Sequence, residues 1–234
     1  MIKGIFFDID DTIFDFNKCS VIALNKTCEY YHVSFNDTIL NEYRKIDDIL
    51  WKKQKLGIYT IDEVLKLRSD YMMDIMDIQN YDKTFKEVYF EELGKTIELV
   101  DNIEVVLNEF KSKGYRLYCA SNGFYDMQMY RLNKAHLLHY FDELFVSDKV
   151  GYEKPNIKFF ETCLNETKLR KDEVLMIGDS YLADIEGAHH AGWKTCYFNR
   201  KNQINRLNVI EFKEMKELLD KEKLWKLENY WMHY

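Results

Sequence analysis

The chain has 234 residues, of which 47% are hydrophobic and 31% are charged. These proportions are typical of a globular protein and exclude a disordered chain. The net charge is −7, and the basic residues form no dense cluster, which argues against nucleic acid or an anionic membrane as a partner. The apolar runs are far shorter than a membrane span, and we find no secretion signal at the start of the sequence.

The cysteines favour a reducing compartment. They are odd in number, widely spaced and never arranged as C-x-x-C: Cys19, Cys28, Cys119, Cys163 and Cys196. We therefore expect reduced thiols in the core of a cytoplasmic protein.

The first elements are one strand followed by helices. The run from Ile2 to Asp8 is apolar, short and bounded by polar residues, as expected for a buried strand. From about residue 17 to 93, apolar residues recur at helical spacing, so every recognisable element there is a helix. Thr60 and Glu63 form a T-x-x-E capping box, which predicts that one of these helices begins after Thr60.

Beyond residue 96 the pattern changes to alternating helices and strands. Helices are predicted near 101–113, 125–138, 155–168 and 182–191, with strands at 115–120, 144–146, 174–177 and 195–198. This alternation predicts a parallel sheet with helices on both faces. The predicted fold class is therefore α/β, with a Rossmann-like sheet.

The order of the elements predicts two domains. Residues 1–16 and 96–234 would form the α/β core domain, and residues 17–95 would form an inserted helical domain. The segment 211–234 is charged and rich in aromatic residues, and we predict a helix that docks on the body of the protein or contacts a second copy.

Polar residues follow each predicted strand of the sheet. The segments are Asp8-Ile9-Asp10-Asp11-Thr12, Ser121-Asn122-Gly123, Gly151-Tyr152-Glu153-Lys154-Pro155, and Gly178-Asp179-Ser180 with Asp184. Ligands of parallel sheets bind beyond the carboxyl ends of the strands, so these residues are expected to meet at one edge. Crowded carboxylates require a compensating cation, and an oxygen-only ligand set with room for water suits Mg²⁺.

The same residues suit phosphoryl transfer. Ser121 and Lys154 can donate hydrogen bonds to phosphoryl oxygens. One carboxylate can attack phosphorus to form an aspartyl-phosphate. A second carboxylate two residues along can protonate the leaving oxygen and then deprotonate the attacking water. The residues alone thus predict Mg²⁺-dependent phosphoryl transfer.

The four segments resemble the four motifs of the haloacid dehalogenase (HAD) superfamily, in the same order and after the corresponding strands. The resemblance covers nearly the whole chain and implies a HAD fold whose inserted helices form a C1-type cap over the substrate. It implies Asp8 as nucleophile and Mg²⁺ ligand, Asp10 as general acid/base whose backbone carbonyl also contacts Mg²⁺, and Asp179 as the third protein ligand.

The resemblance also implies the residues around the transferred group. Ser121, Asn122 and Lys154 would bind the substrate, with Lys154 also offsetting the charge of the nucleophile. Asp184 would support the site by orienting the third metal ligand or a water. We interpret Asp11 as structural, and Asp15 as a hydrogen-bond acceptor at the hinge to the inserted helices.

Within the superfamily, details resemble the pyrimidine 5′-nucleotidase group. These include the segment 11–16, Leu50-Trp51 and Ser121-Asn122-Gly123, although that group usually has Thr in place of Ser121. The expected substrate is a small phosphomonoester, foremost a pyrimidine nucleoside 5′-monophosphate. A sugar-phosphate phosphatase, a phosphomutase and a non-catalytic binding module stay open as alternatives. The carboxylates of Asp10 and Asp179 argue against a dehalogenase. We expect the protein to be a monomer or a homodimer.

Overall fold

The computed structural model describes residues 1–220. The chain forms two compact units, of which one contains Met1–Asp15 and the chain from Leu99 onward, and the other contains Phe16–Glu98. The boundaries therefore fall at 15/16 and 98/99, compared with 16/17 and 95/96 expected from the sequence. Each unit is described separately below.

The first unit contains a six-stranded sheet with the order β3-β2-β1-β4-β5-β6, in which every neighbouring pair is parallel. The strands are β1 (Gly4–Phe7), β2 (Arg116–Ser121), β3 (Glu143–Val146), β4 (Val174–Gly178), β5 (Lys194–Phe198) and β6 (Ile210–Phe212). β1 and β4 are buried along their whole length, as expected for strands covered on both faces. The predicted α/β class with a parallel sheet is confirmed.

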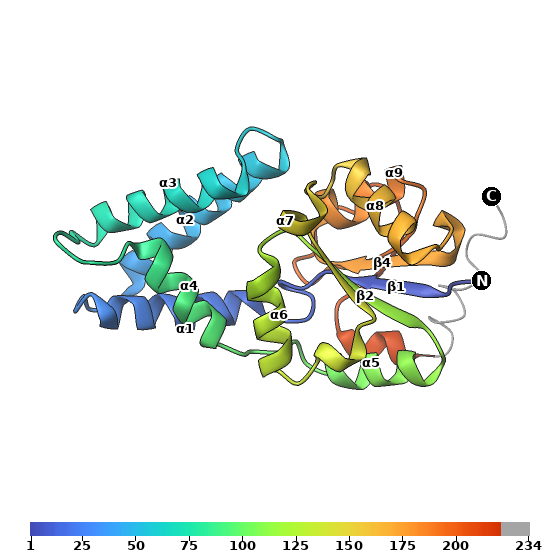
Figure 1. Ribbon diagram of the computed structural model, residues 1–234. Coiled ribbons are helices and arrows are strands. Elements are labelled where there is room, and N and C mark those ends of the chain that lie inside the picture. The colour runs from blue at the N-terminus through green and yellow to red at the C-terminus, as the bar shows by residue number, and fades with distance from the viewer. Residues whose placement is uncertain (221–234) are drawn as a thin grey trace. The chain divides into compact units, whose positions relative to one another are not determined.

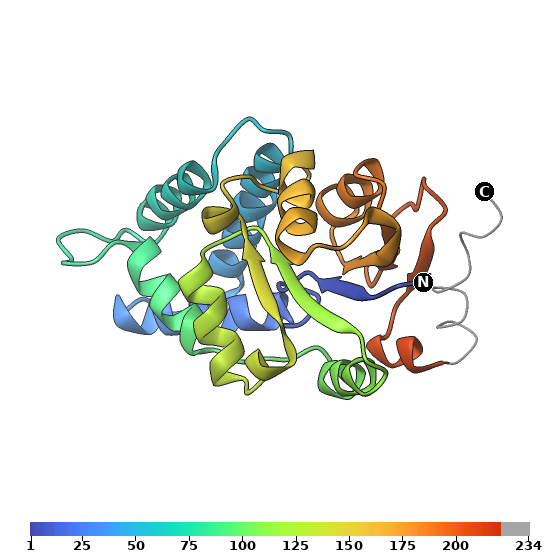
Figure 2. The same cartoon turned by 45° about the vertical axis from the view of Figure 1, so that its right-hand side comes forward.

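Helices cover both faces of this sheet. Figure 1 shows α8 and α9 on one side of the sheet and α5 on the other, and Figure 2 shows the same arrangement after a turn. The helices of this unit are α5 (Ile103–Ser112), α6 (Tyr125–Lys134), α7 (Ser147–Val150), α8 (Ile157–Thr167) and α9 (Gly187–His190). Single-turn or 3₁₀ segments are η1 (Leu138–Tyr140), η2 (Lys171–Glu173) and η4 (Met215–Leu219), and η3 (Tyr181–Glu186) is π-helical.

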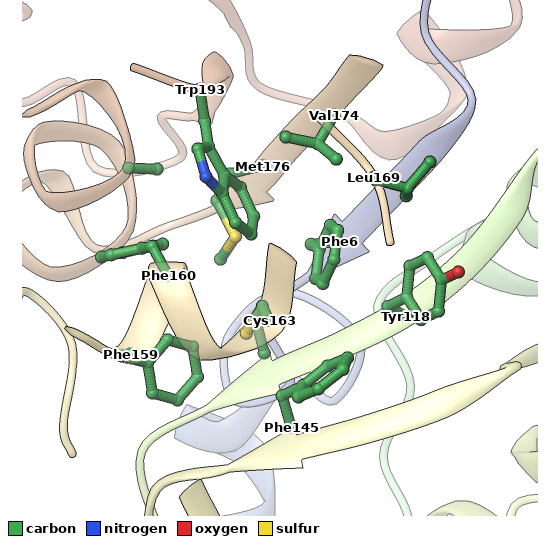
Figure 3. Packing of buried hydrophobic residues seen from close by; sticks show 12 residues of the cluster. Phe6, Tyr118, Phe145, Phe159, Phe160, Cys163, Leu169, Val174, Met176 and Trp193 are labelled. Atoms are coloured by element: carbon green, nitrogen blue, oxygen red, sulfur yellow. The ribbon is translucent and has the colours of Figure 1, made fainter. Parts of the chain in front are cut away.

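An aromatic cluster fills the space between the sheet and α8 (Figure 3). Phe6 of β1 lies at its centre, with its ring centroid 4.6 Å from those of both Tyr118 and Trp193. Phe160 of α8 meets Trp193 edge-on at 5.3 Å. Fully buried aromatic pairs of this kind contribute about 0.5–1.5 kcal/mol each beyond their area. They fix β1, whose last residue precedes the Asp8 segment.

The predicted helix over 211–234 is wrong where the structure describes it. Ile210–Phe212 forms β6, which extends the sheet parallel to β5, and Met215–Leu219 forms only the short helix η4. The rings of Phe198 and Phe212 stack at 4.8 Å across the two strands. Pairing with a neighbouring strand has outweighed the helical composition of this segment. Residues 221–234 of the predicted helix lie outside the described residues.

The second unit consists of four helices: α1 (Phe16–Tyr30), α2 (Asp37–Lys55), α3 (Ile61–Ile75) and α4 (Phe85–Lys95). The capping box predicted at Thr60 is confirmed: its hydroxyl accepts from the Glu63 N–H at 3.2 Å, and the Glu63 carboxylate accepts from the Thr60 N–H at 2.8 Å. α1 packs on α4 and α2 on α3. Among residues 1–220, no helix combines the length and apolar character that crossing a membrane requires.

Candidate active site

The sheet brings the predicted polar segments to one edge. Phe7, the last residue of β1, pairs in register with Cys119 of β2 and Ile177 of β4, so the three strands end nearly level. Asp8 continues this pattern, because its N–H donates to the Ile177 carbonyl at 2.9 Å. The residues just beyond these strand ends therefore share one small volume.

Lys154 lies at the centre of this volume. Its ammonium group donates to the carboxylate of Asp8 at 2.9 Å, to the carboxylate of Asp184 at 2.6 Å and to the carbonyl of Ala120 at 2.5 Å. Three acceptors use all three N–H bonds of an ammonium group. The side chains of Lys154 and Asp184 are 2% and 1% exposed, so the ion pair is shielded from water.

Burial and mutual charge determine the protonation of these groups. Burial raises the pKa of Asp8 well above its usual range; Lys154 offsets part of this effect, whereas Asp184 and Asp179 add to it. Burial alone would lower the pKa of Lys154, but the carboxylates of Asp184 and Asp8 raise it above the usual value. Lys154 is thus cationic at neutral pH, and its charge favours the carboxylate form of Asp8 against the effect of burial.

Asn122 positions the backbone of Lys154. Its side-chain amide donates to the Lys154 carbonyl at 2.8 Å, and its side-chain oxygen accepts from the Lys154 N–H at 2.8 Å. This pair of bonds connects the end of β2 to the loop before α8. Both ends of the Asn122 side chain thus bond the backbone of Lys154, and its contact with a substrate stays a prediction.

Asp184 is oriented by the segment that follows β4. One carboxylate oxygen accepts from Lys154, and the other accepts from the backbone N–H of Ser180 at 2.9 Å. This carboxylate packs on Gly178, where a Cβ atom would overlap it. Glycine at position 178 is therefore what allows Asp184 to reach the strand ends.

Three carboxylates form a group that could hold a cation. Oxygen atoms of Asp8, Asp179 and Asp184 all lie within 4.8 Å of one another. Oxygen donors only, partly shielded from water, are the ligand set that Mg²⁺ prefers. Because both oxygens of Asp184 already accept hydrogen bonds, Asp8 and Asp179 are the better candidates for direct ligands.

The side chain of Asp10 points to a different set of partners. Its carboxylate accepts from Arg131 at 2.6 Å through one oxygen and from Gln128 at 2.7 Å through the other. Gln128 also donates to the hydroxyl of Ser121 at 3.2 Å. Neither of these two α6 residues is predicted from the sequence, where their spacing of three, which places them on one helix face, is the only local signal.

Asp11 and Asp15 contact the loop after β5. Arg200 donates to the carboxylate of Asp11 at 3.0 Å and to that of Asp15 at 3.3 Å. Lys201 donates to the other Asp11 oxygen at 3.2 Å and lies 3.8 Å from a carboxylate oxygen of Asp179. The geometry gives Asp11 a structural role, since φ is 63° there and the side chain ties two loops together.

Comparison with known proteins identifies the family. Residues 5–198 match the model of the haloacid dehalogenase-like hydrolase family, and the protein therefore belongs to that family of enzymes. The chain is 27% identical over 228 residues to the HAD-hydrolase YfnB of Bacillus subtilis, covering 97% of both chains. A crystal structure of YfnB bound to magnesium superposes with a TM-score of 0.83, covering 93% of this chain and 96% of that one at 28% identity.

Two further relatives have named activities. The chain is 27% identical over 236 residues to the pyrimidine 5′-nucleotidase PynA of Streptococcus pneumoniae, covering 96% of this chain and 98% of the relative. It is 29% identical over 249 residues to the glyceraldehyde 3-phosphate phosphatase of Methanothermobacter thermautotrophicus, covering 94% and 100%. These relatives act on phosphate esters of different kinds.

Proposed function

We propose that the protein is a Mg²⁺-dependent phosphatase that hydrolyses a small phosphomonoester through an aspartyl-phosphate on Asp8. The observation that carries the proposal is the contact of the buried Lys154 with both Asp8 and Asp184. This contact fixes the orientation of the Asp8 carboxylate at the strand ends and places the positive charge of Lys154 beside it. The similarity to phosphatases and nucleotidases over almost the whole chain supports the same chemistry.

In the first half of the reaction, the carboxylate of Asp8 attacks phosphorus and the bond to the leaving oxygen breaks. Asp10 gives its proton to that oxygen, so the alcohol leaves neutral. As Asp8 attacks and its carboxylate loses charge, the N–H of Lys154 that contacts Asp8 turns to a phosphoryl oxygen, and the hydroxyl of Ser121 donates to another.

In the second half, water attacks the phosphorus of the aspartyl-phosphate. Asp10, now ionised, accepts a proton from that water, and the bond between Asp8 and phosphorus breaks. Inorganic phosphate leaves, and Asp8 is again a carboxylate while Asp10 again carries a proton. Two separate steps thus use the same acid/base residue in opposite directions.

Asp8, Asp179 and the backbone carbonyl of Asp10 are the groups proposed to hold Mg²⁺. The ion would neutralise charge on the phosphoryl oxygens and on Asp8. The oxygen-only donor set supports this choice, as does the magnesium reported for YfnB. Removal of the ion by EDTA is therefore expected to abolish turnover.

For the substrate, we propose a pyrimidine nucleoside 5′-monophosphate, with the helical unit Phe16–Glu98 acting as the cap that excludes water. The similarity to PynA supports a nucleotide. The similarity to glyceraldehyde 3-phosphate phosphatase supports a sugar phosphate as the second candidate. A cytoplasmic location, as monomer or homodimer, remains part of the proposal, and the free thiols are consistent with a reducing compartment.

The test is phosphate release from UMP, dUMP, dTMP, purine nucleotides, glyceraldehyde 3-phosphate and phosphoglycolate, each with Mg²⁺ and with EDTA. Asp8→Asn removes the nucleophile, and Asp172→Asn, at the opposite end of β4, is the matched control. We expect metal-dependent release that Asp8→Asn abolishes and Asp172→Asn retains, with pyrimidine nucleotides preferred. Preference for a sugar phosphate moves the enzyme to the second candidate. Absence of release from every ester in folded, Mg²⁺-supplied protein refutes the phosphatase proposal.

A further inference from the structure

Two residues of α6 hold the carboxylate of Asp10 and connect it to the phosphate-binding end of β2. Arg131 and Gln128 each donate to one of its two oxygens, at 2.6 and 2.7 Å. Arg131 also donates to the Gln128 side-chain oxygen at 3.1 Å, which turns the amide of Gln128 toward Asp10. That same amide lies 3.2 Å from the hydroxyl of Ser121.

The guanidinium group of Arg131 is itself fixed in place. Its side chain is 1% exposed, although it is charged at all relevant pH values. It lies over the ring of Phe14, 4.2 Å from the ring centroid, in a cation–π contact. Phe14 forms a backbone bridge with Asp10, so Arg131 contacts both ends of the short segment that carries Asp10.

The space that Arg131 fills does not by itself require a charged side chain. Burial of a charge is costly, and an apolar residue of similar size would fill the same space. What the charge adds is a fixed direction for one carboxylate. Proton transfer requires that carboxylate within hydrogen-bond reach of the reacting oxygen.

We propose that Arg131 and Gln128 are positioning residues, which orient Asp10 for proton transfer and keep it in register with Ser121. The inference rests on the proposed phosphatase function and adds two residues to it. It predicts a selective defect: reactions that need a proton on the leaving oxygen lose rate, and reactions with a good leaving group lose little.

The experiment compares kcat/KM for phenyl phosphate and p-nitrophenyl phosphate, which present the same phosphoryl group. p-Nitrophenolate is a weak base and departs without a proton, whereas phenolate is a stronger base and needs one. The variants are Arg131→Met, Arg131→Lys and Gln128→Met, with Lys134→Met on the exposed side of α6 as the control. Thermal unfolding confirms that each variant is folded.

For Arg131→Met we expect a loss of about tenfold to a hundredfold with phenyl phosphate and of less than about threefold with p-nitrophenyl phosphate, a part of the 10²–10⁴ that acid–base catalysis supplies. Gln128→Met follows the same direction, Arg131→Lys recovers part of the loss, and Lys134→Met behaves as wild type. If Arg131→Met does not fold, Gln128→Met decides the question.

An equal loss for both substrates, or none, overturns the positioning role. An equal loss shows that α6 merely supports the site as a whole, and no loss shows that Asp10 finds its orientation without these residues. Failure of the proposed function itself is distinguishable, because the wild-type enzyme then releases phosphate from neither ester, and the inference is refuted together with it.

Discussion

Replacement of Lys154 by methionine tests the electrostatic basis of the site most directly. Methionine fills nearly the same volume but lacks the ammonium group that contacts Asp8, Asp184 and the Ala120 carbonyl. Two buried carboxylates then face each other without a cation. We expect the free energy of unfolding to fall by about 3–5 kcal/mol at neutral pH, the usual cost of removing one partner from a buried ion pair.

The distances support this magnitude. At an effective dielectric constant of about 20, charges separated by the observed 2.9 and 2.6 Å attract by about 6 kcal/mol each. Desolvation of the lysine offsets several kcal/mol of this sum. Uptake of a proton by one carboxylate relieves part of the remaining repulsion, by about 1.4 kcal/mol for each unit by which its pKa exceeds the pH.

The sign of the pH dependence follows from that proton. Burial already raises the pKa of Asp8, and removal of Lys154 raises it further. A carboxyl group with a raised pKa binds its proton more tightly in the folded chain, so the variant gains stability as the pH falls toward 5 and loses it as the pH rises. The difference from wild type is therefore smaller near pH 5 than near pH 8.

The assay is urea unfolding of Lys154→Met, wild type and Lys158→Met at these pH values, without metal and with Mg²⁺. Lys158 is an exposed lysine on the first turn of α8, and its replacement is expected to change stability by less than about 0.5 kcal/mol. Mg²⁺ should stabilise Lys154→Met more than wild type, because the variant site lacks the positive charge of Lys154. A loss below about 1 kcal/mol, or one independent of pH, refutes the reasoning.

Three further predictions concern other parts of the same structure. Gly178→Ala pushes Asp184 from the strand ends, and we expect a loss of phosphate release greater than about tenfold, with Ser180→Ala as a milder comparison that keeps the backbone donor. All five cysteines are buried, and burial raises the pKa of Cys28 to about 11. A thiol reagent at pH 8 should therefore label none of them in the native protein and all five in denaturant. Rapid labelling of the native protein would contradict the burial of the thiols. Burial raises the pKa of Tyr31 and of Tyr197 to about 12, so the unfolded chain ionises these groups first and stability falls as the pH rises from about 10 to 12. In urea titrations, the free energy of unfolding of the Tyr→Phe variants should fall less steeply over this pH range than that of wild type. An unchanged pH dependence counts against this prediction.

The fold was predictable where a local pattern and the tertiary environment agree. β1 and β4 are continuous apolar runs that are buried on both faces, so sequence and structure coincide. The capping box at Thr60 is a short-range device, and it appears as expected. The segment around Phe212 has helical composition, but β5 offers it an unpaired edge, and that long-range partner cannot be seen from local periodicity.

The residues of the site were likewise predictable from the sequence only where the order of elements places them. Asp8 and Asp179 come directly after β1 and β4, so parallel pairing brings them to one edge and their proximity was predictable from the order of elements. Lys154 lies beyond α7 and Asp184 lies within η3, and both reach that edge through the segments that follow the strands. Arg131 lies on a helix whose rotation about its own axis decides what the residue contacts. That rotation depends on side-chain packing along the whole of α6, for example the burial of Leu132.

Charge explains why such residues escape a search by motif. An aspartate after a strand is conspicuous, since its polarity contrasts with the apolar run before it, whereas an arginine in a helix is read as a solvated side chain. Arg131 is nevertheless among the largest fully buried side chains of the described residues. A buried cation requires an anion, and here that anion is the carboxylate of Asp10. The residues that orient the acid/base group are therefore found by asking which buried charges have their partners in the site.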